Sequence, residues 1–108
     1  MAEVHDCFSI TEAVIMEDLQ FSPRGRVKDD IEAGTFRLEG ELPVQPDGGL
    51  KCFGHPIGAS GLRMMYEVYL QLQGRAGPRQ IKNPQLGLTH NLGGFPYLSV
   101  ISCCIAGL

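Results

Sequence analysis

Several features that would each indicate a class of protein are missing from this chain. Its longest apolar run, at residues 97–105, is too short to cross a bilayer and is broken by two serines, so we expect no membrane segment. Its cysteines and histidines show neither a Cys-x-x-Cys pair nor paired histidine spacing, so we expect no metal site.

A positive charge excess is also missing. Nine Lys and Arg residues stand against twelve Asp and Glu, which gives a net charge of −3. The basic residues within 24–28 run directly into the acidic pair at 29–30, a pattern typical of a solvent-facing segment whose charges compensate one another. We therefore expect no binding to nucleic acid.

The cysteines do not form a disulfide framework. Cys103 and Cys104 are adjacent within an apolar run, and Cys7 and Cys52 each lie near a glycine-rich or polar loop. This usage indicates free thiols in a reducing compartment. Since residues 106–108 are also not a Ser-Lys-Leu peroxisomal address, we expect the cytoplasm.

Length and composition allow one small globular domain, residues 1–108. The chain is 44% hydrophobic and 19% charged, within the ordinary range of soluble domains. The first element is the end of a strand at residues 3–4. Ser9, with Glu12 three residues later, has the form of a capping box and predicts a helix through about Leu19. A loop is predicted at 22–26 and a half-exposed extended segment at 35–39.

The second half of the chain predicts a helix and two strands. Apolar residues recur at helical spacing from Leu62 to Leu72 and predict a helix that ends near Gly74 and packs this stripe onto a sheet. Strands are expected at 85–89 and at 97–105, the latter buried on both faces. The fold class is therefore α/β, a mixed sheet with helices on its faces.

The segment 48–61 is the most informative one for function. His55 stands in a tight turn between Gly54 and Pro56, and the predicted helix follows within a few residues. Glycines permit close approach of a ligand, and free N–H groups at a helix start can bind an anion. The turn is a candidate position for a catalytic base, although a histidine in such a turn can also serve packing alone.

Two further motifs accompany this turn, in a specific order. Residues 5–8 read HDCF, residues 54–56 read GHP, and residues 90–94 read HNLGG. This order resembles the C-terminal part of the thiolase family, in its sterol-carrier-protein and archaeal type. The resemblance spans nearly the whole chain, and it implies a thiolase-type C-terminal domain that is incomplete at its N-terminal side.

The resemblance implies reversible Claisen condensation and thiolysis of 3-oxoacyl-CoA. It makes His55 the base that activates a nucleophilic cysteine, and Cys7 the acid/base at the carbon next to the thioester. His5 and the backbone N–H of Gly93 would stabilise oxyanions. Coenzyme A thioesters are then substrates, and no cofactor is expected. Most thiolases carry a cysteine in the last motif, where this chain has Asn91.

No stretch of the chain resembles the thiolase half that supplies the nucleophilic cysteine. We therefore expect the active site to be completed by an N-terminal thiolase half or a partner subunit, in a homo- or hetero-oligomer, and the chain alone to be inactive. Two alternatives stay open: a thiolase-like retro-aldol lyase acting on a CoA ester, and a non-catalytic assembly or binding module.

Overall fold

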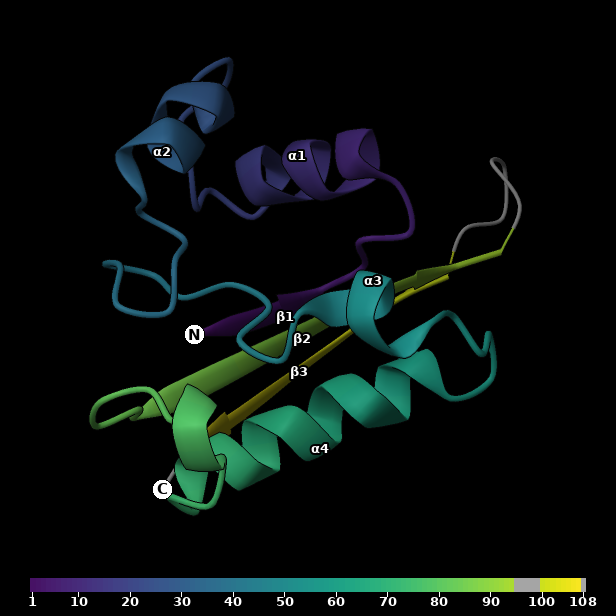
Figure 1. Cartoon of the computed structure of the whole chain (residues 1–108). Coiled ribbons are helices and arrows are strands. Elements are labelled where there is room, and N and C mark those ends of the chain that lie inside the picture. Colours follow the sequence, from purple (N-terminus) through teal and green to yellow (C-terminus); the bar gives the residue numbers. More distant parts are fainter. Residues whose placement is uncertain (95–99, 108) are drawn as a thin grey trace.

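The computed structural model describes residues 1–94 and 100–107. Its elements, in chain order, are β1 (Ala2–Val4), α1 (Ser9–Asp18), α2 (Val27–Ala33), α3 (Gly49–Phe53), α4 (Ser60–Leu72), a short 3-10 helix (Gly77–Arg79), β2 (Leu86–Gly93) and β3 (Val100–Gly107). The strands form one sheet in the order β1-β2-β3, with β1 parallel to β2 and β2 antiparallel to β3. The α1 and α2 helices lie on one side of the sheet and α4 lies on the other (Figure 1). This mixed sheet between helices is the predicted α/β class.

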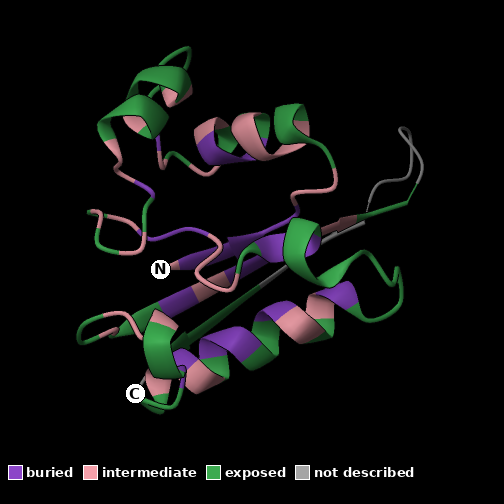
Figure 2. Cartoon of the chain, in the orientation of Figure 1, coloured by how far each residue is buried: buried purple, intermediate pink, exposed green. Residues whose placement is uncertain are grey.

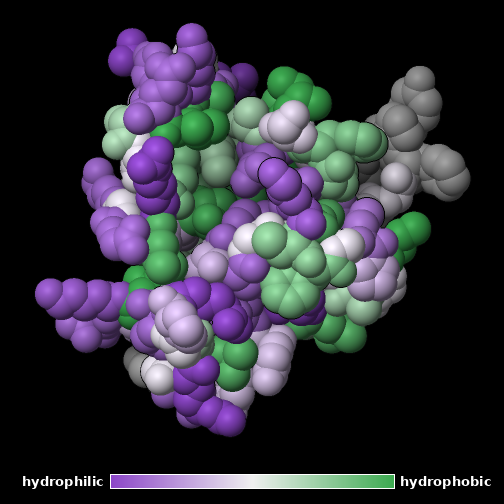
Figure 3. Space-filling model, in the orientation of Figure 1, coloured by the Kyte–Doolittle hydropathy of each residue, from purple (hydrophilic) through white to green (hydrophobic). Residues whose placement is uncertain are grey.

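Successive side chains of β1 face opposite sides of the sheet, one apolar and one polar. Ala2 and Val4 are fully buried and pack with Ile15 and Met16 of α1, whereas Glu3 faces α4 on the opposite side of the sheet. The buried residues follow this sandwich in Figure 2, along β1, on the inner side of α1 and on one side of α4. In the space-filling view, hydrophilic side chains cover α2 and hydrophobic ones fill the space beneath α1 (Figure 3). The apolar core therefore lies between α1 and the sheet.

The first predicted helix is confirmed, but its capping box is wrong. The α1 helix spans Ser9–Asp18, and its N-cap is Phe8, with no side-chain hydrogen bond at the cap. Ser9 already has helical geometry, so its hydroxyl is not in the position from which a capping side chain reaches the N3 amide.

The α2 helix was not expected from the sequence. It carries two exposed ion pairs, Arg26 with Asp29 at 3.0 Å and Lys28 with Glu32 at 3.7 Å. These are the spacings at which a helix brings opposite charges together. The predicted self-compensating, solvent-facing segment is therefore confirmed, as a helix.

The extended segment predicted at 35–39 is wrong, because these residues form turns. Phe36 is only 8% exposed and belongs to the core, and its carbonyl accepts the Val44 N–H at 3.1 Å. The Leu42 N–H donates to the carbonyl of Thr35 at 3.0 Å. The alternating pattern at 35–39 does not mark a strand. It arises because a turn places the large Phe36 side chain in the core, and tertiary packing overrides the local preference for a strand.

The α4 helix is where predicted, but its orientation is the reverse of the prediction. Leu62, Met65, Tyr66 and Tyr69 are exposed, with 63%, 41%, 61% and 51% of their surface accessible. The face toward the sheet carries instead the buried residues Ser60, Met64, Glu67, Val68 and Gln71. Its polar members have hydrogen-bond partners within the chain, such as Gln71 and Arg79 for Glu67, so they can face the sheet while the apolar stripe faces outward.

The last two strands differ from the prediction in extent and burial. The β2 strand runs to Gly93, so all of the third motif except Gly94 lies within a strand and not in a loop. The β3 strand begins at Val100, and the predicted positions 97–99 lie outside the described residues. Cys104 and Ile105 are exposed, because β3 forms an edge of the described sheet and α4 covers little of it.

Within the described residues, no helix is long and apolar enough to cross a membrane. Cys7, Cys52 and Cys104 are free thiols.

Candidate active site

Three sequence motifs meet at one end of the sheet. The rings of His5 and His55 lie edge to face, with centroids 5.1 Å apart and planes at 77°. His5 Nδ1 lies 3.3 Å from Oδ1 of Asn91. One residue from each of the segments 5–8, 54–56 and 90–94 thus takes part in a single cluster, although these segments are far apart in the sequence.

The parallel pairing of β1 with β2 explains why His5 and Asn91 meet. Val4 is the register partner of His90, so the next residues, His5 just after β1 and Asn91 within β2, lie side by side. Both then lie on the α4 side of the sheet, because side chains alternate along a strand. Asn91 also closely approaches Gly61 at the start of α4, where an added Cβ would lie 3.0 Å from Asn91 Nδ2.

Ser60 orients the catalytic candidate His55. Its hydroxyl oxygen lies 2.8 Å from His55 Nδ1 and 3.2 Å from the carbonyl oxygen of Pro56. A serine hydroxyl has one proton; when that proton goes to Pro56, Oγ can only accept a hydrogen bond from His55 Nδ1–H. Nε2 of the neutral ring then carries the lone pair and is available as a base. His55 itself is exposed, whereas Ser60 is buried.

His5 is buried, with only 5% of its surface accessible. With Asn91 Oδ1 as the acceptor, the neutral His5 ring donates from Nδ1 and presents Nε2 as an acceptor. Only the imidazolium form would donate from Nε2 as well. The oxyanion role expected for His5 therefore requires either the charged ring or a rotated Asn91 amide.

Asp6 connects the first motif to the second. Its carboxylate accepts the Leu50 N–H, at 3.1 Å to Oδ1 and 3.0 Å to Oδ2. Leu50 is the second residue of α3, so the carboxylate lies at the positive end of that short helix. Gly49 makes this approach possible, because a Cβ there would overlap the Asp6 carboxylate. The loop after β1 is thereby held against the segment that leads into the GHP turn.

The other two predicted site residues lie at the ends of these segments. Cys7 is half-buried and follows Asp6 in the same loop. Gly93 is the last residue of β2 and is exposed. The structure thus brings His5 and His55 into contact and places Cys7 and Gly93 on the segments that carry His5 and Asn91.

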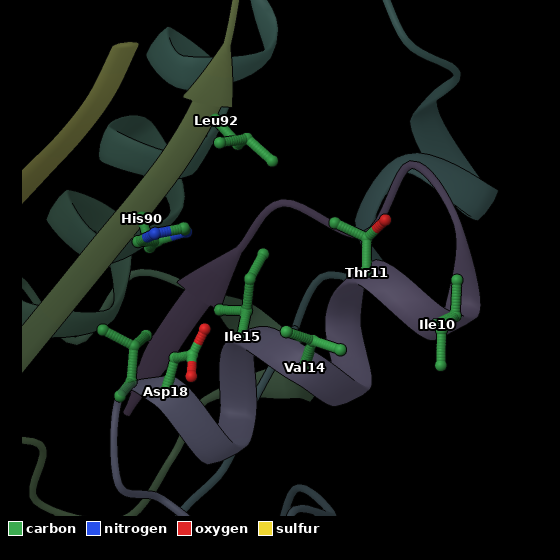
Figure 4. Close-up of a pocket in the computed structure, with 8 residues that line it drawn as sticks. Ile10, Thr11, Val14, Ile15, Asp18, His90 and Leu92 are labelled. Carbon is green, nitrogen blue, oxygen red and sulfur yellow. The ribbon is translucent and has the colours of Figure 1, made fainter. Parts of the chain in front are cut away.

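A hollow lined mainly by apolar side chains lies away from this cluster. A hollow of about 520 Å³ opens between α1 and β2, lined by Ile10, Thr11, Val14, Ile15, Asp18, Leu19, His90 and Leu92. Figure 4 shows His90 and Leu92 reaching into it from β2, opposite the side chains of α1. His90 and Asn91 are neighbours on a strand and so point to opposite faces. Burial lowers the pKa of the His90 imidazole, which favours its neutral form. Among the described residues, no three acidic, cysteine or histidine side chains are grouped as a metal site would require.

Sequence reasoning did not assign roles to Ser60, Asp6 and Asn91. Asp6 and Asn91 belong to the motifs at 5–8 and 90–94, so their positions near the site could have been inferred from the sequence. Ser60 lies five residues after His55 and two before the apolar stripe that predicts the helix; it is the first residue of α4, where a hydroxyl can reach back to the preceding turn.

Residues 1–104 match the family described as "Thiolase C-terminal domain-like". The chain belongs to the thiolase C-terminal domain family. The described cluster therefore lies in a thiolase-like fold.

Two relatives show how much of a longer protein this chain matches. A protein of Methanothermobacter thermautotrophicus named acetyl-CoA acetyltransferase is 48% identical over 94 residues, which cover 87% of this chain and 24% of that protein. The sterol carrier protein 2 of Gallus gallus is 42% identical over 91 residues, or 84% of this chain and 17% of that protein. The thiolase C-terminal domain described above thus spans less than a quarter of the length of either relative.

Proposed function

We propose that this domain supplies the acid/base part of the active site of a thiolase-type acyltransferase that acts on 3-oxoacyl-CoA. The observation that carries the proposal is the contact between His5 and His55, with Ser60 bound to His55 Nδ1. It presents Nε2 of an exposed imidazole next to a second, buried imidazole. This is an arrangement suited to taking a proton from a thiol and stabilising negative charge nearby.

In the proposed reaction, His55 takes the proton of a cysteine thiol that the N-terminal thiolase half supplies. The thiolate attacks the thioester carbonyl of an acyl-CoA, the carbon–sulfur bond to CoA breaks, and the CoA thiolate leaves with that proton. The acyl group then stays on the cysteine as a thioester. Coenzyme A thioesters are substrates here, and the chemistry needs no further cofactor.

The second half-reaction involves Cys7. Its thiolate removes a proton from the carbon next to the carbonyl of a second acyl-CoA, and the resulting enolate attacks the acyl-cysteine. The new carbon–carbon bond forms as the nucleophilic cysteine leaves as a thiolate. His55, the charged form of His5 and the Gly93 N–H are the proposed donors to the oxyanions that form in both steps.

The surface next to the turn supports completion of this site by another polypeptide. Phe53 and Ile57, which flank His55, are 56% and 84% exposed, and the exposed stripe of α4 follows them in the chain. An uncovered apolar surface at a candidate active site is typical of an interface. The N-terminal thiolase half, or a partner subunit that carries it, is the proposed occupant, and the cytoplasm the proposed compartment.

The test combines the chain with an N-terminal thiolase half and follows loss of the acetoacetyl-CoA enolate absorbance after addition of CoA. We expect turnover in the mixture and none with the chain alone. His55→Ala should lower the rate by at least about a hundredfold, the scale of a lost general base. Lys28→Ala, on the distant and exposed α2, is the matched control and should keep the parent rate.

Intact mass separates the three functions considered. A thiolase forms an acyl adduct on the N-terminal half, a retro-aldol lyase cleaves its CoA ester without one, and an assembly module does neither. A rate for His55→Ala within a few-fold of the parent would contradict the role of His55.

A further inference from the structure

A buried cluster of ionisable side chains joins β1, α4 and the segment before α3, and it takes no part in the chemistry described above. Arg63 of α4 donates from Nη1 to Glu3 Oε2 at 3.1 Å and to Oδ2 of Asp47. The side chains are 14%, 0% and 2% exposed, in that order. One guanidinium thus faces two carboxyl groups away from water.

Such a cluster is a poor source of stability. Burying ions costs several kcal/mol each, and the mutual attraction offsets this only when the remaining polar atoms also have partners. Here Glu3 Oε1 and Arg63 Nε and Nη2 are buried without a hydrogen-bond partner among the described residues. Packing alone therefore does not account for three ionisable residues at this position.

The cluster connects the segments that carry the two histidines. Glu3 lies on β1, two residues before His5. The other oxygen of Asp47 accepts the Gly49 N–H at 2.8 Å, at the start of α3. The Arg63 guanidinium also lies over the Phe53 ring, 5.4 Å from its centroid, and Phe53 is the last residue of α3 before the GHP turn.

The turn itself has little other support. Residues 54–59 are all exposed, and no Cβ added at Gly54 or Gly58 would meet another atom within 4 Å. The ring of His55 is fixed by its bond to Ser60, but the backbone that carries it depends on the ends of the turn. Arg63 contacts the approach to the turn through Asp47 and Phe53, and it belongs to the helix that follows.

We propose that Arg63 is a positioning residue that holds His55 against His5, through Asp47 and Phe53 on one side and Glu3 on the other. Arg63 bonds Glu3 and Asp47 through Nη1 while the face of its guanidinium lies over the Phe53 ring. A lysine ammonium could bond carboxyl groups but has no planar face to stack, so we expect lysine to replace it only in part. The catalytic consequence rests on the function proposed above, whereas the placement of the two rings is a property of this chain alone.

The first test measures ring proximity in the 108-residue chain by nuclear Overhauser effects between the imidazole protons of His5 and His55. We expect the parent to show these cross-peaks, Arg63→Met to lose them and Arg63→Lys to lose at least half of their intensity. Arg79→Met is the matched control, because Arg79 makes a comparable bond to buried Glu67, from Nη2 to Oε2 at 2.8 Å, near the other end of α4.

The control separates positioning from general stability. Urea unfolding of each variant gives its loss of stability, and Arg79→Met should keep the cross-peaks at a similar loss. Unchanged cross-peaks in folded Arg63→Met, or equal losses in both variants, would overturn the proposal. Because Arg63→Met leaves two buried carboxylates without a cation, Asp47→Asn is the second variant. Asparagine has nearly the same volume as aspartate, and we expect this variant to weaken the cross-peaks. Cross-peaks of parent intensity in folded Asp47→Asn would also overturn the proposal.

The second test uses the mixture with the N-terminal thiolase half. Arg63→Lys should lower kcat about tenfold and leave KM nearly unchanged, as expected for misplacement of a group that acts in the transition state. If the parent mixture is inactive while Arg63→Met loses the cross-peaks, the proposed function fails and the positioning role stands. If the parent mixture is active while Arg63→Lys keeps both kcat and cross-peaks, the positioning role fails and the function stands.

Discussion

A single hydroxyl group determines which nitrogen of His55 can act as a base. Ser60 is 1% exposed, and its bonds to His55 and to the Pro56 carbonyl place the ring proton on Nδ1. A histidine can act as a base only if its unprotonated nitrogen faces the proton to be removed. The hydrogen-bond partner of the other nitrogen therefore matters as much as the histidine itself.

Ser60→Ala should lower kcat of the completed enzyme by about tenfold, because the imidazole loses its fixed tautomer and orientation. The ring ¹⁵N shifts of His55 check the cause directly: the parent should show a protonated Nδ1, and the variant a mixture of tautomers. Ser9→Ala, at an exposed serine without a capping bond, is the control. Parent-like shifts in Ser60→Ala would contradict the assigned tautomer.

Glu3 gives the domain a pH dependence of its own. Burial, with the nearby Asp47 carboxylate, raises the pKa of Glu3 from 4.5 to about 9, although Arg63 acts in the opposite direction. A carboxyl whose pKa is raised on folding contributes stability that is complete below its unfolded pKa and is lost as the pH rises through its folded pKa. The relevant window is therefore pH 4.5 to about 9.

Glu3→Gln mimics the neutral form and should remove this dependence. We expect the free energies of unfolding of parent and variant to be close near the lower end of that window, and the variant to become increasingly more stable toward its upper end. Urea unfolding across the window measures both, with Glu32→Gln on the exposed face of α2 as the control. A pH-independent difference would mean that Arg63 keeps Glu3 ionised throughout.

The short helix α3 shows how one glycine positions an element. Gly49 has a φ of +62°, and a Cβ there would overlap the Asp6 carboxylate that accepts the Leu50 N–H. Both the backbone conformation and the close approach exclude a side chain. The link between the loop after β1 and the segment before His55 depends on this position.

Gly49→Ala should destabilise the domain by about 1–3 kcal/mol, because it combines a left-handed backbone with a lost buried hydrogen bond. Gly58→Ala is the matched control, since that glycine has no positive φ and no neighbour within 4 Å of an added Cβ. Its effect should stay within about 0.5 kcal/mol. Urea unfolding compares the two, and equal effects would argue against the Asp6 contact.

At the scale of the whole molecule, the most consequential feature is the outward face of α4. Leu62, Met65, Tyr66 and Tyr69 form an exposed stripe on it, and a hollow of about 310 Å³ beside it is lined in part by Met65, Tyr69 and Cys104. Exposed apolar surface of this kind favours association. We therefore expect this face to be covered by another domain or subunit.

The double variant Leu62→Glu/Tyr66→Glu should abolish association. We expect the parent to sediment above its monomer mass of 11.8 kDa at micromolar concentration, or to bind the N-terminal thiolase half, and the variant to do neither. Ile31→Glu, at a half-exposed apolar residue of α2, is the control for added charge. If the parent chain stays monomeric and does not bind the N-terminal thiolase half, the prediction is wrong.

The sequence by itself determined the family, the α/β class and the three segments that build the site. Motifs such as GHP at 54–56 are local, so they can be recognised before any fold is known. The helices at 9–18 and 60–72 were also predicted to within about two residues. The second rested on apolar periodicity and a following glycine, which are local signals, whereas the first rested on a capping box that does not form.

Only the tertiary structure decided which face of α4 is buried and which residues meet. Periodicity groups Leu62, Met65 and Tyr66 on one side of a helix, but it cannot say whether that side meets the sheet. Polar residues such as Glu67 are buried because their partner, Arg79, comes from another segment. The meeting of His5 with Asn91 likewise follows from the register of β1 on β2, a pairing between strands more than eighty residues apart that no local pattern specifies.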